Sequence, residues 1–308
     1  MSVLFAAVAA AGSLILQDPA PAPQIPPAAA ATELDDVIVR QQRLEQAVRN
    51  FVDEVAAPTP GQGAARWDRR VCVGIANVRN PMAQQLVDRV SDVAMEIGLQ
   101  PGEPGCKPNL LIIGSTDAGA LARGLVEASP AAFRPNWTGS DRGGVALQRF
   151  IDTDAAVRWW HVGVPVNPDT NDVAVRISVD DAWAARKTFV RQPSRLRTNL
   201  RNRLERVFVI VDFDRAEGLA LNQLGDYVAM VALAQIDPEA ETEGFDSVLN
   251  LFRAPASVDG LTGWDRSYLT GLYGAELTSH SVAHQRDEVT HVMRRDRQAA
   301  GSTGDEAE

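Results

Sequence analysis

The sequence contains little lysine, few aromatic residues and an excess of acid over base. Of its 30 basic residues only Lys107 and Lys187 are lysines, and the formal net charge of the 308-residue chain is -10 at pH 7. Non-specific binding to nucleic acid or to anionic membranes requires excess positive charge, so this composition argues against both partners. A hydrophobic content of 45% and a charged content of 23% are typical of a globular chain that can bury a core.

The N-terminal apolar run is too short to span a membrane. Residues 3–16, VLFAAVAAAGSLIL, fall short of the roughly 20 residues that a spanning helix needs. The run has the length of a signal peptide, although no lysine or arginine precedes it. We expect a signal-peptide-like segment over 1–17, a Pro/Ala-rich linker over 18–42, and a periplasmic or envelope-associated protein with no membrane span after signal removal. An uncleaved anchor and a disordered cytoplasmic tail are the alternatives.

Only two cysteines are present. Cys72 lies in the strand-like segment RRVCVGIANV, and Cys106 lies in the turn PGEPGCKPN before the next expected strand. Two neighbouring parallel strands would bring these cysteines close together, and an exported chain with two cysteines favours a disulfide. The alternative is one buried and one exposed thiol. Because no Cys-x-x-Cys spacing occurs, the pair does not predict a metal site.

Hydrophobic periodicity predicts a single α+β domain over residues 43–276, with one mixed β-sheet and helices packed mainly on one face. A polar helix and tail are expected over 277–308, and both ends of the chain are expected to be disordered. The expected strands cover residues 70–78, 109–116, 156–166, 172–179 and 206–213. The expected helices cover residues 43–56, 80–99, 117–129, 193–206, 217–236 and 260–276.

Several of these elements carry more detailed expectations. The order strand, helix, strand, helix over 70–129 implies a parallel strand pair with a right-handed crossover, and Asp117 is expected to cap the second helix. The strands over 156–166 and 172–179 are expected to form an antiparallel hairpin. Arginines on the expected helix 193–206 and beside it are assigned to its solvated face: Arg191, Arg195, Arg197, Arg201, Arg203 and Arg206.

The helix expected over 217–236 contains LNQLGDYVAMVALAQI, is followed by Asp237-Pro238, and is apolar on nearly all sides in its C-terminal half. Such a helix is buried. Together with its neighbours it resembles part of a zincin-type metallopeptidase domain: a strand, an active-site helix, a variable loop and a closing helix over residues 206–276. The closing helix carries the elements Leu261-Thr262, Asp265, and Leu269 to Tyr273. More loosely, the whole chain resembles uncharacterised exported proteins of Gram-negative bacteria.

The resemblance implies a degenerate active site. Zincins carry H-E-x-x-H on this helix, with two histidine ligands one turn apart and a glutamate as general base. The matching positions here are Asp226, Tyr227 and Met230, and Ile236 stands in the third ligand position. A thioether is a poor zinc ligand, and tyrosine with a pKa of about 10 is a poor base at neutral pH. We therefore assign no catalytic residue, no metal and no cofactor.

Histidine and tryptophan residues elsewhere give weaker indications. His280 and His284 are one turn apart and His291 continues their face, which allows either a metal site or, more simply, a solvated terminal helix. His161 is expected to pack at a sheet edge. The adjacent Trp159 and Trp160 are of a type that stacks on a sugar or peptide, but alternation along a strand sends one ring to each face.

The sequence thus favours an exported, non-catalytic binding or scaffold protein whose partner, still unidentified, belongs to the cell envelope. An active hydrolase with a non-standard site around Asp226 and Tyr227 is the main alternative. A cytoplasmic structural protein is a third hypothesis, and it requires the apolar N-terminus to have no role.

Overall fold

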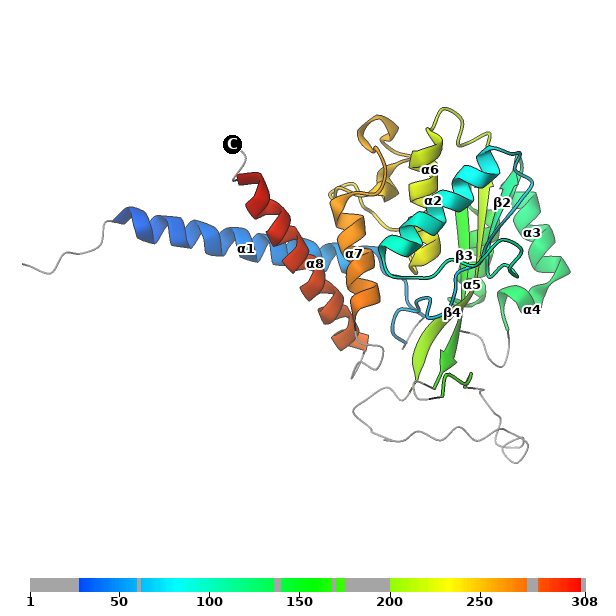
Figure 1. Cartoon of the computed structure of the whole chain (residues 1–308), viewed down its shortest axis with the longest axis horizontal. Coiled ribbons are helices and arrows are strands. Elements are labelled where there is room, and N and C mark those ends of the chain that lie inside the picture. Colours follow the sequence, from blue (N-terminus) through cyan, green and yellow to red (C-terminus); the bar gives the residue numbers. More distant parts are fainter. Residues whose placement is uncertain are drawn as a thin grey trace, which may run out of the picture. The chain divides into compact units, whose positions relative to one another are not determined.

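The computed structural model describes residues 28–59, 62–135, 140–167, 170–174, 200–275 and 282–305. The chain divides into two compact units, Met1–Gln42 and Arg43–Glu308. Helix α1 (Ala28–Val55) begins inside the segment expected to be a linker, so that expectation is wrong from Ala28 onwards (Figure 1). The physical reason is that residues 28–31 are all alanine, the strongest helix former.

One four-stranded mixed sheet organises the second unit (Figure 1). Its strands are β1 (Val73–Ala76), β2 (Leu110–Ser115), β3 (Val157–Val166) and β4 (Arg201–Asp212). The spatial order is β1-β2-β4-β3, in which β1, β2 and β4 run parallel and β3 is antiparallel to β4. The predicted α+β class with a mixed sheet is confirmed, and β3 forms one edge of that sheet.

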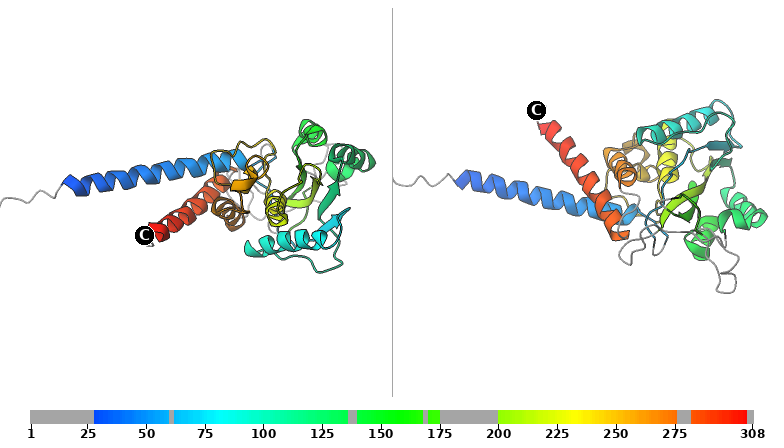
Figure 2. Two further views of the ribbon diagram at one scale, coloured as in Figure 1. Left: turned by 90° about the horizontal axis from the view of Figure 1, so that it is seen from above. Right: turned by 60° about the horizontal axis from the view of Figure 1, so that its bottom comes forward.

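Helices cover both faces of this sheet, with the larger layer on one face (Figure 2). That layer includes α2 (Met82–Glu96), α6 (Leu221–Leu233) and α7 (Gly263–Gly274). The smaller layer on the other face consists of α3 (Ala118–Ala128), α4 (Pro130–Phe133) and α5 (Gly143–Asp152). The remaining helical segments are η2 (Val248–Asn250), η3 (Pro255–Ser257) and α8 (Val282–Asp305).

Strand β4 separates the two cores by simple alternation. Val207, Val209 and Val211 face the larger core, whereas Phe208 and Ile210 face the smaller one. Successive side chains of a strand point to opposite faces, so a run that is apolar at every position identifies a strand covered on both sides. Among the described residues, no helix combines the length and apolarity that a membrane crossing requires.

Two predictions concern the neighbours of β3. Strand β3 pairs along its length with β4, and the described start of the expected strand 172–179 lies antiparallel to the end of β3, with a bridge between Val166 and Val173 and a hydrogen bond of 2.8 Å from the Ala174 amide to the Pro165 carbonyl. Residues 175–199 lie outside the described part. The expected helix 193–206 is a strand from Arg201 onwards. The prediction of a helix rested on Leu196, Leu200 and Leu204, which recur at every fourth residue. Pairing with β2 and β3 on both sides overrides this local spacing.

The same correction applies to the arginines of that segment. Arg201 and Arg203 are on β4 and pair with the Asp68 carboxylate, with nitrogen–oxygen distances of 2.7 and 3.7 Å. Arg203 is buried, so these two side chains do not form a solvated helix face. Arg191, Arg195 and Arg197 lie outside the described residues.

The expected disulfide and helix cap are both present. Cys72 precedes β1 and Cys106 lies in the connection to β2, and the parallel pairing of β1 with β2 brings their Cα atoms to 6.0 Å. Asp117 caps α3 by accepting a hydrogen bond from the Ala120 amide at 2.9 Å. Both features follow from local segments that the sequence pattern identifies.

Candidate binding cavity beside strand β3

Helix α6 is buried along most of its length, as its apolar pattern predicts. Met230, which the sequence resemblance puts in a zinc ligand position, has no exposed surface and belongs to the larger core. Its thioether lies among apolar side chains, where a flexible unbranched residue packs well. In this structure Met230 is a packing residue.

Asp226 on the same helix is engaged by two partners. Its carboxylate accepts a hydrogen bond from Nε of Arg89 on α2 and another, at 2.9 Å, from the backbone N–H of Leu261. Gly260, with a φ of 151°, lets the backbone approach this carboxylate so closely that a Cβ atom would collide with it. Asp226 therefore fastens α6 to α2 and to the loop before α7.

Tyr227 points to a different side of α6. Its ring makes edge contacts with Trp159 and Phe252, at centroid distances of 6.1 and 5.0 Å. Burial raises the pKa of its hydroxyl above the ordinary value of 10, which makes ionisation at neutral pH harder still. Tyr227 thus forms an aromatic wall. Asp226 faces Arg89 on a different side of α6, so Asp226 and Tyr227 do not share a site.

The described residues contain no group of three or more histidine, cysteine, aspartate or glutamate side chains placed to hold a metal ion. On α8, His284 pairs with Glu288 at 3.4 Å, and Nδ1 of His291 lies 3.2 Å from the Arg294 guanidinium. His280 falls outside the described part of the chain.

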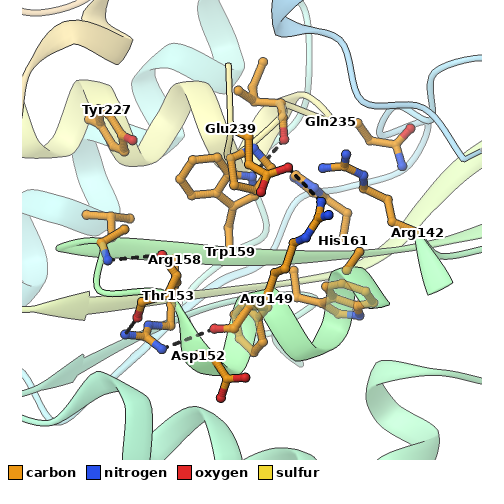
Figure 3. Close-up of a pocket in the computed structure, with 17 residues that line it drawn as sticks. Arg142, Arg149, Asp152, Thr153, Arg158, Trp159, His161, Tyr227, Gln235 and Glu239 are labelled. Carbon is orange, nitrogen blue, oxygen red and sulfur yellow. Dashed lines mark hydrogen bonds and ion pairs between the residues drawn. The ribbon is translucent and has the colours of Figure 1, made fainter. Parts of the chain in front are cut away.

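A cavity of about 380 Å³ lies between α5, strand β3 and the segment that follows α6 (Figure 3). This volume falls within the range of roughly 300–1,000 Å³ that ligand sites occupy. Most of its lining is apolar or aromatic. The apolar and aromatic lining residues are Ala146, Phe150, Ala155, Val157, Trp159, Trp160, Tyr227, Ile236 and Pro238.

The position of this cavity relative to the sheet follows from residues 157–161, all five of which line it. Trp159 belongs to the larger core and Trp160 to the smaller core, so they point to opposite faces of β3, as alternation predicts. A single cavity can reach side chains from both faces only where the sheet ends. It therefore lies against the free edge of β3.

Three ring nitrogens of β3 fix the walls of the cavity to backbone carbonyls. Nε1 of Trp159 donates to the Ile236 carbonyl at 3.0 Å, and Nε1 of Trp160 donates to the Phe133 carbonyl at 2.8 Å. Nε2 of His161 lies 2.7 Å from the Val231 carbonyl, which can only accept, so this nitrogen carries the proton.

His161 is neutral in the folded protein. Burial lowers its pKa from 6.5 to about 4, although the hydrogen bond to the Val231 carbonyl acts in the opposite direction. The ring is thus uncharged at pH 7 and connects the sheet edge to α6. Its placement on an edge strand agrees with the expectation from sequence.

Arg158 holds the other wall of the cavity by capping α5. Its guanidinium donates to the carbonyls of Phe150, Ile151 and Thr153, at 3.2, 2.8 and 2.6 Å (Figure 3). It is buried, which lowers its pKa, and no ion pair to a carboxylate is found for it among the described residues. The negative end of the α5 dipole supplies the compensating interaction, so Arg158 positions α5 over β3.

Two arginine–carboxylate pairs, of which Figure 3 draws the one between Arg149 and Glu239, join α5 and the residue before it to the segment after α6 across the cavity mouth. Arg142 donates two hydrogen bonds to Asp237, at 3.0 and 2.9 Å. Arg149 contacts Glu239 at 2.7 Å, with side chains 60% and 62% exposed. A pair so exposed contributes little stability, so it can open at low cost, whereas the bidentate pair is the stronger one.

Comparison of the chain with protein-family models, with curated protein sequences and with solved structures finds no significant match.

Sequence patterns indicated only fragments of this site. The Trp159-Trp160 pair was recognised as a stacking candidate, and Tyr227 was singled out for a different reason. Ile236 was named only as the third ligand position of the zincin pattern. Arg142 and Arg149 were not assigned to any site, because the residues around the cavity come from separate segments that only the fold brings together.

Proposed function

We propose that this chain is a non-catalytic binding protein of the cell envelope and that the cavity beside β3 is its binding site. The observation that carries the proposal is an aromatic-lined cavity of about 380 Å³ at a sheet edge. Its polar lining groups are held by other parts of the protein, as the pairs of Arg142 and Arg149 and the hydrogen bond of His161 illustrate. An apolar cavity with a few oriented polar groups is the usual form of a ligand site.

The disulfide supports the envelope location. Bridges of this kind persist in the periplasm and other oxidising compartments and are rare in the cytosol, and Cys72 and Cys106 form one here. The apolar run over 3–16 supports export by its length and composition. Fusion of alkaline phosphatase after residue 60 should give activity in an exporting bacterium, and activity only from a cytoplasmic reporter fused at the same point would contradict export.

We also propose that residues 206–276 descend from a zincin-type metallopeptidase. The order of strand β4, helix α6 and helix α7 supports this, because it matches the order of elements in the family resemblance. Under this proposal Asp226, Tyr227 and Met230 have become a brace, a cavity wall and a core residue. The alternative of an active hydrolase gains no support, since Asp226 is paired with Arg89 and Tyr227 is buried against Trp159.

The binding proposal is tested by filling the cavity. Ala146→Phe on α5 should place a ring in the space, and Ala128→Phe on the exposed end of α3 serves as the matched control. With N-phenyl-1-naphthylamine as a neutral apolar fluorescent probe, we expect saturable one-to-one binding by the native protein. Ala146→Phe should weaken it at least about tenfold, a difference of about 1.4 kcal/mol, and the control should not. Equal binding by both variants, or no saturable binding, would reject this cavity as the site.

A further inference from the structure

Alternate residues of β3 turn their backbone N–H and C=O groups away from β4 and toward the cavity. The Asp212 amide donates to the Ala156 carbonyl at 2.8 Å, and the Val207 amide donates to Asn109 on the opposite side of β4. Because bonding residues alternate along an antiparallel ladder, Val157, Trp159 and His161 turn their N–H and C=O groups away from β4. No other described segment pairs with the backbone of these three residues.

Further along the same edge, short segments of the chain already pair with β3. Ser140 and Gly163 exchange two backbone hydrogen bonds of 2.7 and 2.8 Å, and the Ala174 amide donates to the Pro165 carbonyl at 2.8 Å. The edge is thus extended at residues 163–165 and open at 157–161, where the cavity lies. An added strand at the open part would continue pairing that this edge already makes.

We propose that the cavity takes an extended peptide segment of a partner protein, which adds a strand to β3 at Val157, Trp159 and His161. The segment places an apolar side chain in the cavity and an acidic side chain on Arg149. This inference rests on the proposed binding function, and it names the ligand and its mode of recognition. Strand addition obtains affinity from the main-chain bonds and specificity from the pockets that receive alternate side chains.

The spacing of the open backbone groups matches this ligand. Residues two apart in a strand are separated by about 6.6–6.8 Å, which is also the repeat of donors and acceptors along a paired peptide. Val157, Trp159 and His161 therefore present three successive sites at the period of a strand. An unpaired edge is the surface on which proteins accept an additional strand.

The charges at the mouth favour an acidic residue in the peptide. Asp237 holds Arg142 through two hydrogen bonds, whereas Arg149 has one exposed contact with Glu239. An incoming carboxylate can replace Glu239 on Arg149 without leaving a buried charge unpaired. Val145, one turn before Arg149 on the same face of α5, is 72% exposed and offers apolar contact to a peptide that extends beyond the cavity.

The test compares two backbones with the same side chains. The probes are a synthetic library of fluorescein-labelled, end-blocked hexapeptides with aliphatic or aromatic residues at alternate positions and threonine or glutamate between them, together with copies N-methylated at every second residue. N-methylation removes the donors of one edge and leaves the side chains in place. We expect the native protein to bind glutamate-containing members below about 1 mM, and N-methylation to weaken binding at least tenfold.

Matched variants test the charge assignment on the same probes. Arg149→Gln should weaken binding of the glutamate peptides several-fold and leave their threonine analogues unchanged. Arg286→Gln, which changes an exposed arginine on α8, should affect neither. Circular dichroism of each variant confirms that it is folded before binding is compared.

The outcomes separate this inference from the binding function on which it rests. Equal affinity for normal and N-methylated peptides would overturn strand addition while leaving an apolar binding cavity. Binding of N-phenyl-1-naphthylamine without binding of any peptide would also overturn strand addition and retain the binding function. If neither probe binds, both proposals fail.

Discussion

The carboxylate of Asp226 on α6 is paired with the guanidinium of Arg89 on α2. Under the proposed zincin ancestry, Asp226 stands at the position of the first zinc ligand. The same carboxylate also accepts a hydrogen bond from the Leu261 amide. A side chain that holds two helices and a loop together has a structural role. Its removal should therefore lower the free energy of unfolding.

Asp226→Ala should therefore destabilise the protein by about 1.5–3 kcal/mol, because it removes the carboxylate bound by Arg89 and the Leu261 amide, while Arg89 keeps its longer pair with Glu96. Urea unfolding measures the change. A double-mutant cycle with Arg89→Ala should give a favourable coupling between the two residues, since each single change removes the same interaction. Atomic spectroscopy of the native protein and of Asp226→Ala tests the altered-hydrolase alternative. Stoichiometric zinc in the native protein that is absent from the variant would support that alternative and contradict a purely structural role.

Met230→Ala should cost about 2–5 kcal/mol, because it leaves a cavity in the centre of the larger core. The matched control is Met95→Ala on α2, whose side chain is 55% exposed and should contribute within about 0.5 kcal/mol of zero. Denaturant unfolding of the two variants gives the comparison directly. Similar losses for both methionines would contradict the assignment of Met230 to the core.

The disulfide between Cys72 and Cys106 should stabilise the oxidised protein by about 3–4 kcal/mol. It links two residues that are 34 positions apart in the sequence and so restricts the unfolded chain. Cys72→Ser should lower the thermal midpoint under oxidising conditions. Under reducing conditions the variant and the native chain should unfold at nearly the same temperature. Two free thiols in protein isolated from the periplasm would refute the bridge.

His161 should make the folded state sensitive to acid. Its pKa is about 4 in the folded protein against an ordinary value of 6.5, so between these values the unfolded chain binds more protons. Its contribution to stability is complete above pH 6.5 and decreases as the pH falls, by about 2 kcal/mol between pH 7.5 and 5. Urea unfolding across this range should show a weaker pH dependence for His161→Gln. His284→Gln, on the exposed face of α8, should retain the native dependence.

Local sequence patterns determined much of the secondary structure. The apolar face of α2, the strand runs at β1 and β2, the Asp117 cap and the burial of α6 are all visible from residue order, because each depends on interactions within a turn or within a short alternating segment. Composition and the position of two cysteines also sufficed to predict the disulfide, since the parallel pairing of adjacent strands brings them together.

The same local reasoning failed where distant residues decided the outcome. Leucine recurs at every fourth residue over 196–204, a spacing that suits a helix, yet the chain from Arg201 onwards forms β4 because β2 and β3 supply hydrogen-bond partners on both sides. The reverse error occurred at residues 28–42, where proline upstream suggested a linker and the alanine run instead begins α1.

The candidate site belongs entirely to the tertiary structure. Its walls come from β3, α5, Tyr227 and the segment 235–239, and no periodicity within any one of these predicts that they meet. Whether β3 lies at an edge is decided by β4, which lies between β3 and β2, a relationship among segments more than 30 residues apart in the sequence. Sequence alone determined which residues are apolar enough to be buried; only the pairing of the strands decided which backbone groups remain open, because a strand's free edge is defined by its neighbours.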